Sequence, residues 1–220
     1  MNLASLITYT KKHAEFDQSL FHGESPSDAD ATELLNWAQR LISRRLKLFS
    51  PTLPITLVNG TQSYDLRSAS VTRPVVKVHR AILNGSPLTN PTGNYGLWTY
   101  AEIEAENPTW RAATSGIPTA AFVTNQTIHF WLKPNATAAA YSNNCLAAQH
   151  LAQDLASGSF ETPEILTELH ESIAVLAAFL GSRPTATEEE MWKRLSEYSQ
   201  NAVDLMDEVA RQNLETIAQL

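Results

Sequence analysis

The sequence predicts an α+β protein in which helices from both ends of the chain form a bundle and a β-rich segment is inserted between them. Apolar residues recur at the helical spacing of 3.6 near both ends, whereas the middle of the chain changes to a period of two. Asn-Gly pairs, which favour tight hairpin turns, fall only in that middle segment. We therefore expect N-terminal bundle helices over 1–54, an inserted antiparallel β-rich subdomain over 55–150, and C-terminal bundle helices over 151–220.

Two helices are predicted before the β-rich segment. The first spans 3–21, and the polar stretch 22–30 has the composition of a loop. The second begins near Asp30, which has capping-box spacing to Glu33. Its apolar positions follow the helical period: Leu34, Leu35, Ala38, Leu41, Ile42, Leu46 and Phe49. It is expected to end before Pro51 and Pro54.

Short strands and tight turns are predicted for the middle of the chain. Asn59-Gly60 and Asn84-Gly85 are expected to form type I′ turns with positive φ at both residues, each joining two strands. A short helix is expected between Tyr100 and Asn107. Three further strands are predicted over 120–124, 127–133 and 138–148.

Helices return with clear terminal signals. Thr162 and Pro163 are suited to the N-cap and first helical position, and Gly181 to the C-terminal end. The pair Thr187 and Glu190 matches a capping box at the start of a long final helix. Apolar residues from 191 to 209 repeat as a short heptad seam, which we expect to pack on other helices of the same chain.

Composition and charge exclude several classes of protein. With 43% hydrophobic residues the chain can bury a core, which argues against disorder. The net charge is −7, and residues 151–220 carry four basic and thirteen acidic groups, so a general nucleic-acid binder is excluded. The acidic segment is either a solvated helix face or a surface that repels DNA. One cysteine, Cys145, fits a reducing compartment, and neither a signal peptide nor a membrane span is evident.

Motifs for catalysis or metal binding are missing from the sequence. There is no phosphate-binding glycine loop, no zinc-type spacing of His and Cys, and no nucleophile elbow. The histidines lack ligand-like spacing and are expected to be surface or half-buried polar groups: His13, His22, His79, His129, His150 and His170. Four carboxylates could do acid–base work, but a solvated helix face explains them: Glu161, Glu164, Glu168 and Glu171. We predict a non-enzyme with no catalytic, cofactor-binding or metal-binding residues.

Two sets of residues are candidates for contacts with other subunits or partners. The first is a basic cluster on the second helix: Arg40, Arg44, Arg45 and Lys47. It is either an exposed edge that pairs with the acidic C-terminal helices or a contact for phosphates or an acidic partner. The second is a set of tryptophans in the β-rich segment: Trp98, Trp110 and Trp131. These pack in the core or anchor an interface, where tryptophan is favoured.

The order of several short motifs resembles a known family. Tyr64-Asp65-Leu66 follows the first helix pair, and the strand with the turn at Asn84-Gly85 comes next. Trp110 then precedes Gly116-Ile117-Pro118 and the stretch TIHFWLKP, which ends at Pro134. Over roughly residues 30–200, this pattern resembles the head-to-tail adaptor (connector) proteins of tailed bacteriophages, which carry a β insert in a helical bundle.

The resemblance implies a structural virion protein made in the host bacterial cytoplasm. Copies of the chain would form a ring, expected to be a dodecamer, that docks beneath the portal protein, extends the DNA channel and gives tail proteins a platform. Genomic DNA would pass through the lumen without sequence-specific binding, and no membrane would be involved. Two alternatives remain: a tail-completion or tail-terminator structural protein, and a small enzyme or ligand-binding module.

Overall fold

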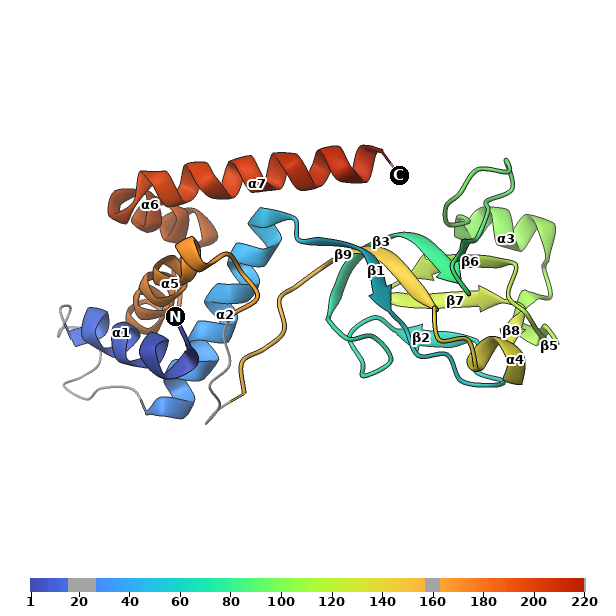
Figure 1. The fold of residues 1–220 in the computed structure, drawn as a ribbon, viewed down its shortest axis with the longest axis horizontal. Coiled ribbons are helices and arrows are strands. Elements are labelled where there is room, and N and C mark those ends of the chain that lie inside the picture. The colour runs from blue at the N-terminus through green and yellow to red at the C-terminus, as the bar shows by residue number, and fades with distance from the viewer. Residues whose placement is uncertain (16–26, 157–162, 220) are drawn as a thin grey trace. The chain divides into compact units, whose positions relative to one another are not determined.

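The computed structural model describes residues 1–15, 27–156 and 163–219 and confirms the α+β class (Figure 1). The chain folds as two compact units. Met1–Leu48 and Ala152–Leu220 form a helical unit, and Phe49–Leu151 form a β unit. The β unit begins before the expected residue 55, because strand β1 spans Phe49–Pro54 and includes both prolines that were expected only to end the preceding helix.

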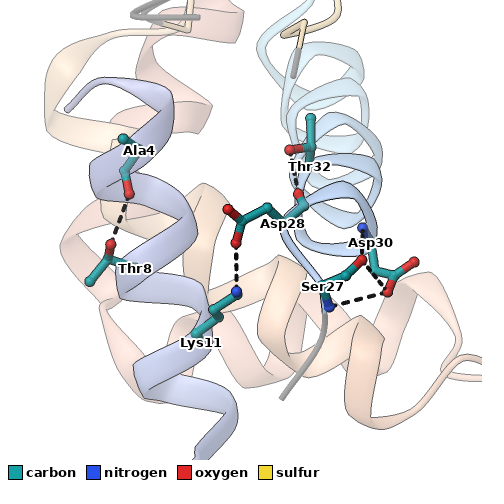
Figure 2. Close-up of polar contacts among 7 residues, drawn as sticks. All are labelled: Ala4, Thr8, Lys11, Ser27, Asp28, Asp30 and Thr32. Atoms are coloured by element: carbon teal, nitrogen blue, oxygen red, sulfur yellow. Dashed lines mark hydrogen bonds and ion pairs between the residues drawn. The ribbon is translucent and has the colours of Figure 1, made fainter. Parts of the chain in front are cut away.

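Helices α1 (Leu3–Glu15) and α2 (Asp28–Leu46) open the helical unit. Figure 2 shows that the capping box of α2 uses Ser27 and Asp30, not Asp30 and Glu33 as predicted. The Asp30 carboxylate accepts hydrogen bonds from the Ser27 backbone N–H at 3.2 Å and hydroxyl at 2.6 Å. Residues 28–30, expected in a loop, are therefore helical, and Ser27 is the N-cap. The rest of that loop, 22–26, and the end of the predicted first helix, 16–21, lie outside the described residues.

Helix α2 is stabilised at both ends by contacts with residues close to those ends. Lys47 adopts the left-handed conformation, with φ at 52°, and its N–H caps the last turn, so the helix ends before either proline. Near the other end, Lys11 of α1 contacts Asp28 at 2.6 Å (Figure 2). A carboxylate in the first turn of a helix also interacts favourably with the helix dipole.

The C-terminal helices differ from the prediction at two points. Helix α5 (His170–Ser182) follows a 3₁₀ turn at Thr167–Leu169, so Pro163 is not its first residue, and Thr162 lies outside the described residues. The expected long final helix is divided into α6 (Glu188–Tyr198) and α7 (Gln200–Ala218). The break occurs at Ser199, which is extended and whose hydroxyl caps α7 by accepting the Ala202 N–H. The capping box of Thr187 and Glu190 at the start of α6 is confirmed.

Helix α5 is the centre of the helical unit and contacts α1, α2 and α6. Ile173, Ala174, Leu176 and Ala177 are all fully buried. A helix that is apolar on nearly every side is suited to such a central position, and its alanines allow close approach of the neighbouring helices. The core of this unit therefore forms around α5, between elements that precede and follow the β unit in sequence.

The β unit contains three small sheets. The largest is antiparallel, with strand order β1-β9-β3-β4, and comprises Phe49–Pro54, Cys145–His150, Val75–Leu83 and Ser86–Pro87. The second is also antiparallel, with order β2-β7-β6, and comprises Ser63–Asp65, Thr127–Trp131 and Ala120–Thr124. A short parallel pair joins β5 (Ser115–Gly116) to β8 (Lys133–Pro134).

The hairpin predicted at Asn84-Gly85 is confirmed, and the one at Asn59-Gly60 is wrong. Asn84 and Gly85 have φ of 49° and 79° between the paired strands β3 and β4. At the other site only Gly60 has a positive φ, and β2 pairs with β7 instead of with a preceding strand. The Tyr64 hydroxyl fixes that loop by accepting the Val58 N–H at 2.9 Å. A turn with positive φ at both Asn125 and Gln126 joins β6 to β7.

Two short helices interrupt the strands. Helix α3 (Tyr100–Glu106) forms where a helix was predicted, with a capping box from Thr99 and Glu102. The predicted strand 138–148 begins only at Cys145, because Asn135 caps a short helix α4 (Ala136–Ala139). The predicted strand 127–133 ends at Trp131, and Lys133 belongs to β8.

Buried Ser43 of α2 holds both chain segments that connect the helical unit to the insert. Its carbonyl accepts the Leu48 N–H at 3.4 Å, and its hydroxyl accepts the Ala152 N–H at 3.1 Å. Within the β unit, Phe49 of β1 pairs with Gln149 of β9. The insert therefore begins and ends on neighbouring strands.

Candidate interaction surfaces

Two of the four predicted cations, Arg40 and Arg45, are neutralised within the chain. The Arg40 guanidinium donates two hydrogen bonds to Asp154, one of them at 2.9 Å from Nε. Arg45 donates to both carboxylate oxygens of Asp207 at 2.9 Å and lies 4.6 Å from the ring centroid of Trp192. Asp207 belongs to α7, so the predicted pairing of this edge with the acidic C-terminal helices occurs for Arg45 inside one chain.

The other two cations, Arg44 and Lys47, are exposed at the end of α2. Neither forms an ion pair with a described residue. We call this pair the basic edge. Because its charges are uncompensated in the described part of the chain, it can attract an acidic surface of another molecule.

A groove of about 630 Å³ lies between α6, the start of α7 and the end of α2. Trp192 and Val203 give it apolar surface, and Glu189 and Lys193 contribute charges. The Trp192 ring is fixed, because Nε1 donates to Glu188 at 3.1 Å and Arg45 lies against the ring. We call this feature the α6–α7 groove. The predicted heptad seam gave no indication of this groove. A single straight helix through Ser199 would leave no concave surface between α6 and α7.

The predicted tryptophans lie together in the β unit. Trp110 is only 5% exposed, packs edge-on against Phe122 with ring centroids 4.8 Å apart, and donates from Nε1 to Glu104 at 2.8 Å. Trp98 and Trp131 are half-buried against the same cluster. For Trp110 the structure therefore shows core packing, while a partner contact for Trp98 and Trp131 stays a prediction.

Arg111 forms an exposed cluster beside Trp110 that sequence analysis did not identify. Its guanidinium lies 4.5 Å from the Trp110 ring centroid and donates to Glu104 at 2.7 Å and to the Tyr100 hydroxyl at 2.5 Å. The hydrogen bond from Trp110, together with those from the Tyr100 and Arg111 side chains, holds the pKa of Glu104 below its usual range. A lone arginine in a short 3₁₀ turn carries no sequence signal for such a cluster.

The half-buried His129 joins the three strands of the second sheet. Its Nδ1 lies 2.8 Å from the Ser63 hydroxyl and its Nε2 lies 2.8 Å from the Thr124 hydroxyl. Burial, with a smaller contribution from the charge of Arg111, lowers the pKa of His129 and favours the neutral ring. Because a threonine hydroxyl occupies the second nitrogen, no carboxylate orients this ring as in a nucleophilic triad.

Among the described residues, the remaining candidates show no arrangement suited to thiol reactivity or metal binding; His22 and Glu161 lie outside the described residues. Burial raises the pKa of the Cys145 thiol, which disfavours the reactive thiolate. Among residues 1–15, 27–156 and 163–219, no group of three or more His, Cys, Asp or Glu is placed to hold a metal ion. Within the same ranges, no helix has the length and apolar character needed to cross a membrane.

Comparison with known proteins gives one match that covers almost the whole chain. A family model described as SU10 adaptor protein matches residues 1–216. This match includes both the helical unit and the β unit. No curated protein matches the chain.

Proposed function

The chain belongs to the SU10 adaptor protein family and is a structural head-to-tail adaptor of a bacteriophage, and we propose that its copies form a ring beneath the portal. In this proposal the ring extends the DNA channel from the portal and offers tail proteins a platform. DNA passes through the lumen without sequence-specific binding, and the chain performs no catalysis. The observation that carries the proposal is the family match, which spans both units of the fold.

The charge distribution supports a ring of identical contacts. Arg44 and Lys47 at the end of α2 form no ion pair with a described residue, while residues 151–220 carry thirteen acidic groups. Two different surfaces of the same chain that attract each other produce a head-to-tail contact, and such a contact closes into a ring when the rotation is suitable. Exposed ion pairs contribute only ~0–1 kcal/mol each. We therefore assign register and orientation to the basic edge, and most of the affinity to apolar contacts.

Imaging of the purified chain, alone and with portal protein, tests this proposal. We expect rings that bind portal, and fewer rings for the double variant Arg44→Glu/Lys47→Glu. Lys12→Glu/Arg67→Glu is the matched control, because it reverses two other exposed cations. Circular dichroism should show that both double variants remain folded. Assembly of the parent should weaken as salt rises, because screening acts over ~8–10 Å at moderate ionic strength.

Two results would contradict parts of this proposal. Rings of Arg44→Glu/Lys47→Glu that form as readily as those of the parent would show that the basic edge is merely solvated surface. Association with tail tube instead of portal would replace the portal-docking role with that of a tail-completion protein.

A further inference from the structure

We propose that the outer face of the β1-β9-β3-β4 sheet binds a protein surface that carries carboxylate groups next to apolar side chains. We call it the cationic sheet face, and its two cations are Lys77 and Arg80 of β3. This contact does not require the proposed ring. It needs only that the chain is a component of the phage particle, which follows from its family.

A register shift in β3 places both cations on the same face of the sheet. In a regular strand, residues three positions apart lie on opposite faces. In β3 the register shifts between Val78 and Arg80, so that one extra residue is accommodated, as in a β-bulge. Lys77 therefore pairs with Gln149 of β9 and Arg80 with Ala147, two positions away on the same face.

The other face of this sheet forms the core of the β unit. Val75, Val78 and Ala81 of β3 are buried there, together with Leu146 of β9. On the cationic sheet face, by contrast, Lys77 is exposed and Arg80 is half-buried. Both cations therefore point away from the core and can be reached by a second molecule.

The two positive charges have no negative counterpart on the sheet. None of its four strands contains Asp or Glu. Neither Lys77 nor Arg80 forms an ion pair with a described residue. Two positions along a strand correspond to ~7 Å, so the two like charges lie near each other without being neutralised. Carboxylates of a partner would relieve this repulsion, which is electrostatic complementarity of the kind found in specific interfaces.

The Arg80 side chain is already positioned for a contact. Its guanidinium lies 5.6 Å from the ring centroid of Tyr95, a residue that is 59% exposed. The backbone of Tyr95 is fixed in turn by an antiparallel bridge to Thr89. A side chain held in place loses less entropy on binding, and tyrosine and arginine are enriched among the residues that dominate interface energies.

Apolar side chains beside the cations favour a protein partner over DNA. Each of them pairs with Cys145 or Gln149 of β9, which share the face of the cations. These apolar residues are at least partly exposed: Phe49, Pro54 and Ile82. Protein interfaces combine an apolar centre with a charged rim, whereas DNA-binding surfaces are more polar and much more positively charged.

Acetylation of lysine amines tests the contact in purified phage particles. We expect Lys77 to react several-fold more slowly in particles than in the free chain, because a partner covers it. Lys133 is the control, since it belongs to β8, outside this sheet, and should react at the same rate in both.

Carbodiimide cross-linking identifies the partner. This reagent joins an amine and a carboxylate in direct contact as an amide, with the loss of one water. In particles, Lys77 should be linked to Asp or Glu of another polypeptide, either a second copy or a different particle protein, and mass spectrometry of the peptides should locate the carboxylate. The free chain should give no such link.

Charge reversal tests whether the contact contributes to assembly. When particles assemble from an equal mixture of parent and variant chain, Lys77→Glu should be incorporated several-fold less than the parent. Arg67→Glu is the matched control: Arg67 is another exposed cation of the β unit, and it lies outside this sheet.

Three results would overturn this inference. The first is equal acetylation of Lys77 in particles and in the free chain, and the second is equal incorporation of Lys77→Glu and the parent. The third is protection that disappears in particles emptied of DNA, without any cross-link to a carboxylate, which would assign the face to DNA. All three leave the ring intact, since imaging tests it separately, whereas absence of the chain from purified particles would contradict the adaptor role itself.

Discussion

Trp110→Ala should destabilise the β unit strongly, because this side chain is the centre of its second core. Trp110 is 5% exposed and contacts Phe122 and His129, with ring centroids 4.8 and 5.5 Å away. A buried aromatic removes about 150–250 Å² from water. At about 25 cal/mol per Å², this corresponds to an upper estimate of about 4–6 kcal/mol. Truncations of buried tryptophan typically cost about 3–5 kcal/mol, which we take as the expected loss.

Urea unfolding, followed by the fluorescence of the remaining tryptophans, measures this loss. With a slope of about 2 kcal/mol per molar urea, the midpoint of the β-unit transition should fall by about 2 M. Trp110→Phe is the matched control: it keeps an aromatic ring against Phe122 but loses the Nε1 hydrogen bond to Glu104, so its shift should be smaller. A midpoint for Trp110→Ala within about 0.5 M of the parent would refute the core assignment. If assembly then failed, Trp110 would be an interface anchor instead.

Three further predictions concern single residues. Gly85→Val and Gly60→Val should each lower the free energy of unfolding by about 1–2 kcal/mol. Both glycines have open space around them, so the cost comes from their positive φ and not from a steric clash. Gly96→Ala is the control and should be nearly neutral, because Gly96 has no positive φ. Ser43→Ala should cost about 1–3 kcal/mol and speed hydrogen exchange at the Ala152 amide, which loses its acceptor; unchanged exchange would contradict this. The pKa of His129 is lowered in the folded chain, so the unfolded chain takes up a proton first below about pH 6.5 and the β unit loses stability as the pH falls. His129→Gln should flatten this pH dependence of the melting temperature, and an unchanged slope would assign it to other groups.

The sequence predicts those elements whose stabilising contacts are local. Thr187 and Glu190 satisfy each other across three positions, and Asn84-Gly85 forms a turn between strands that are adjacent in sequence. The same dipeptide at Asn59-Gly60 misled the prediction, because the strand after it pairs with β7, more than sixty residues away. Turn chemistry alone does not determine which strands pair.

The interaction surfaces were less predictable, because they depend on distant partners. Arg40, Arg44 and Arg45 of the predicted basic cluster lie on α2, whereas Lys47 is the C-cap that ends the helix. Which of these cations are neutralised depends on Asp154 and Asp207, which lie 114 and 162 residues from their partners. The groove depends on one serine that interrupts an otherwise continuous apolar seam. The spacing of apolar residues along the chain predicts which face of a helix is buried. It does not predict where the helix is interrupted or changes direction.

The pairing of Phe49 with Gln149 and the two hydrogen bonds at Ser43 bring the two ends of the inserted β unit close together. Opposed residues on neighbouring antiparallel strands have Cα atoms only about 5 Å apart, a gap that a tight turn spans. Insertions whose ends lie close together are well tolerated in protein evolution. Evolution can therefore exchange, enlarge or recombine the β unit while the helical unit keeps its packing. Related chains can then differ in the surfaces of the β unit without changes to the core of the helical unit.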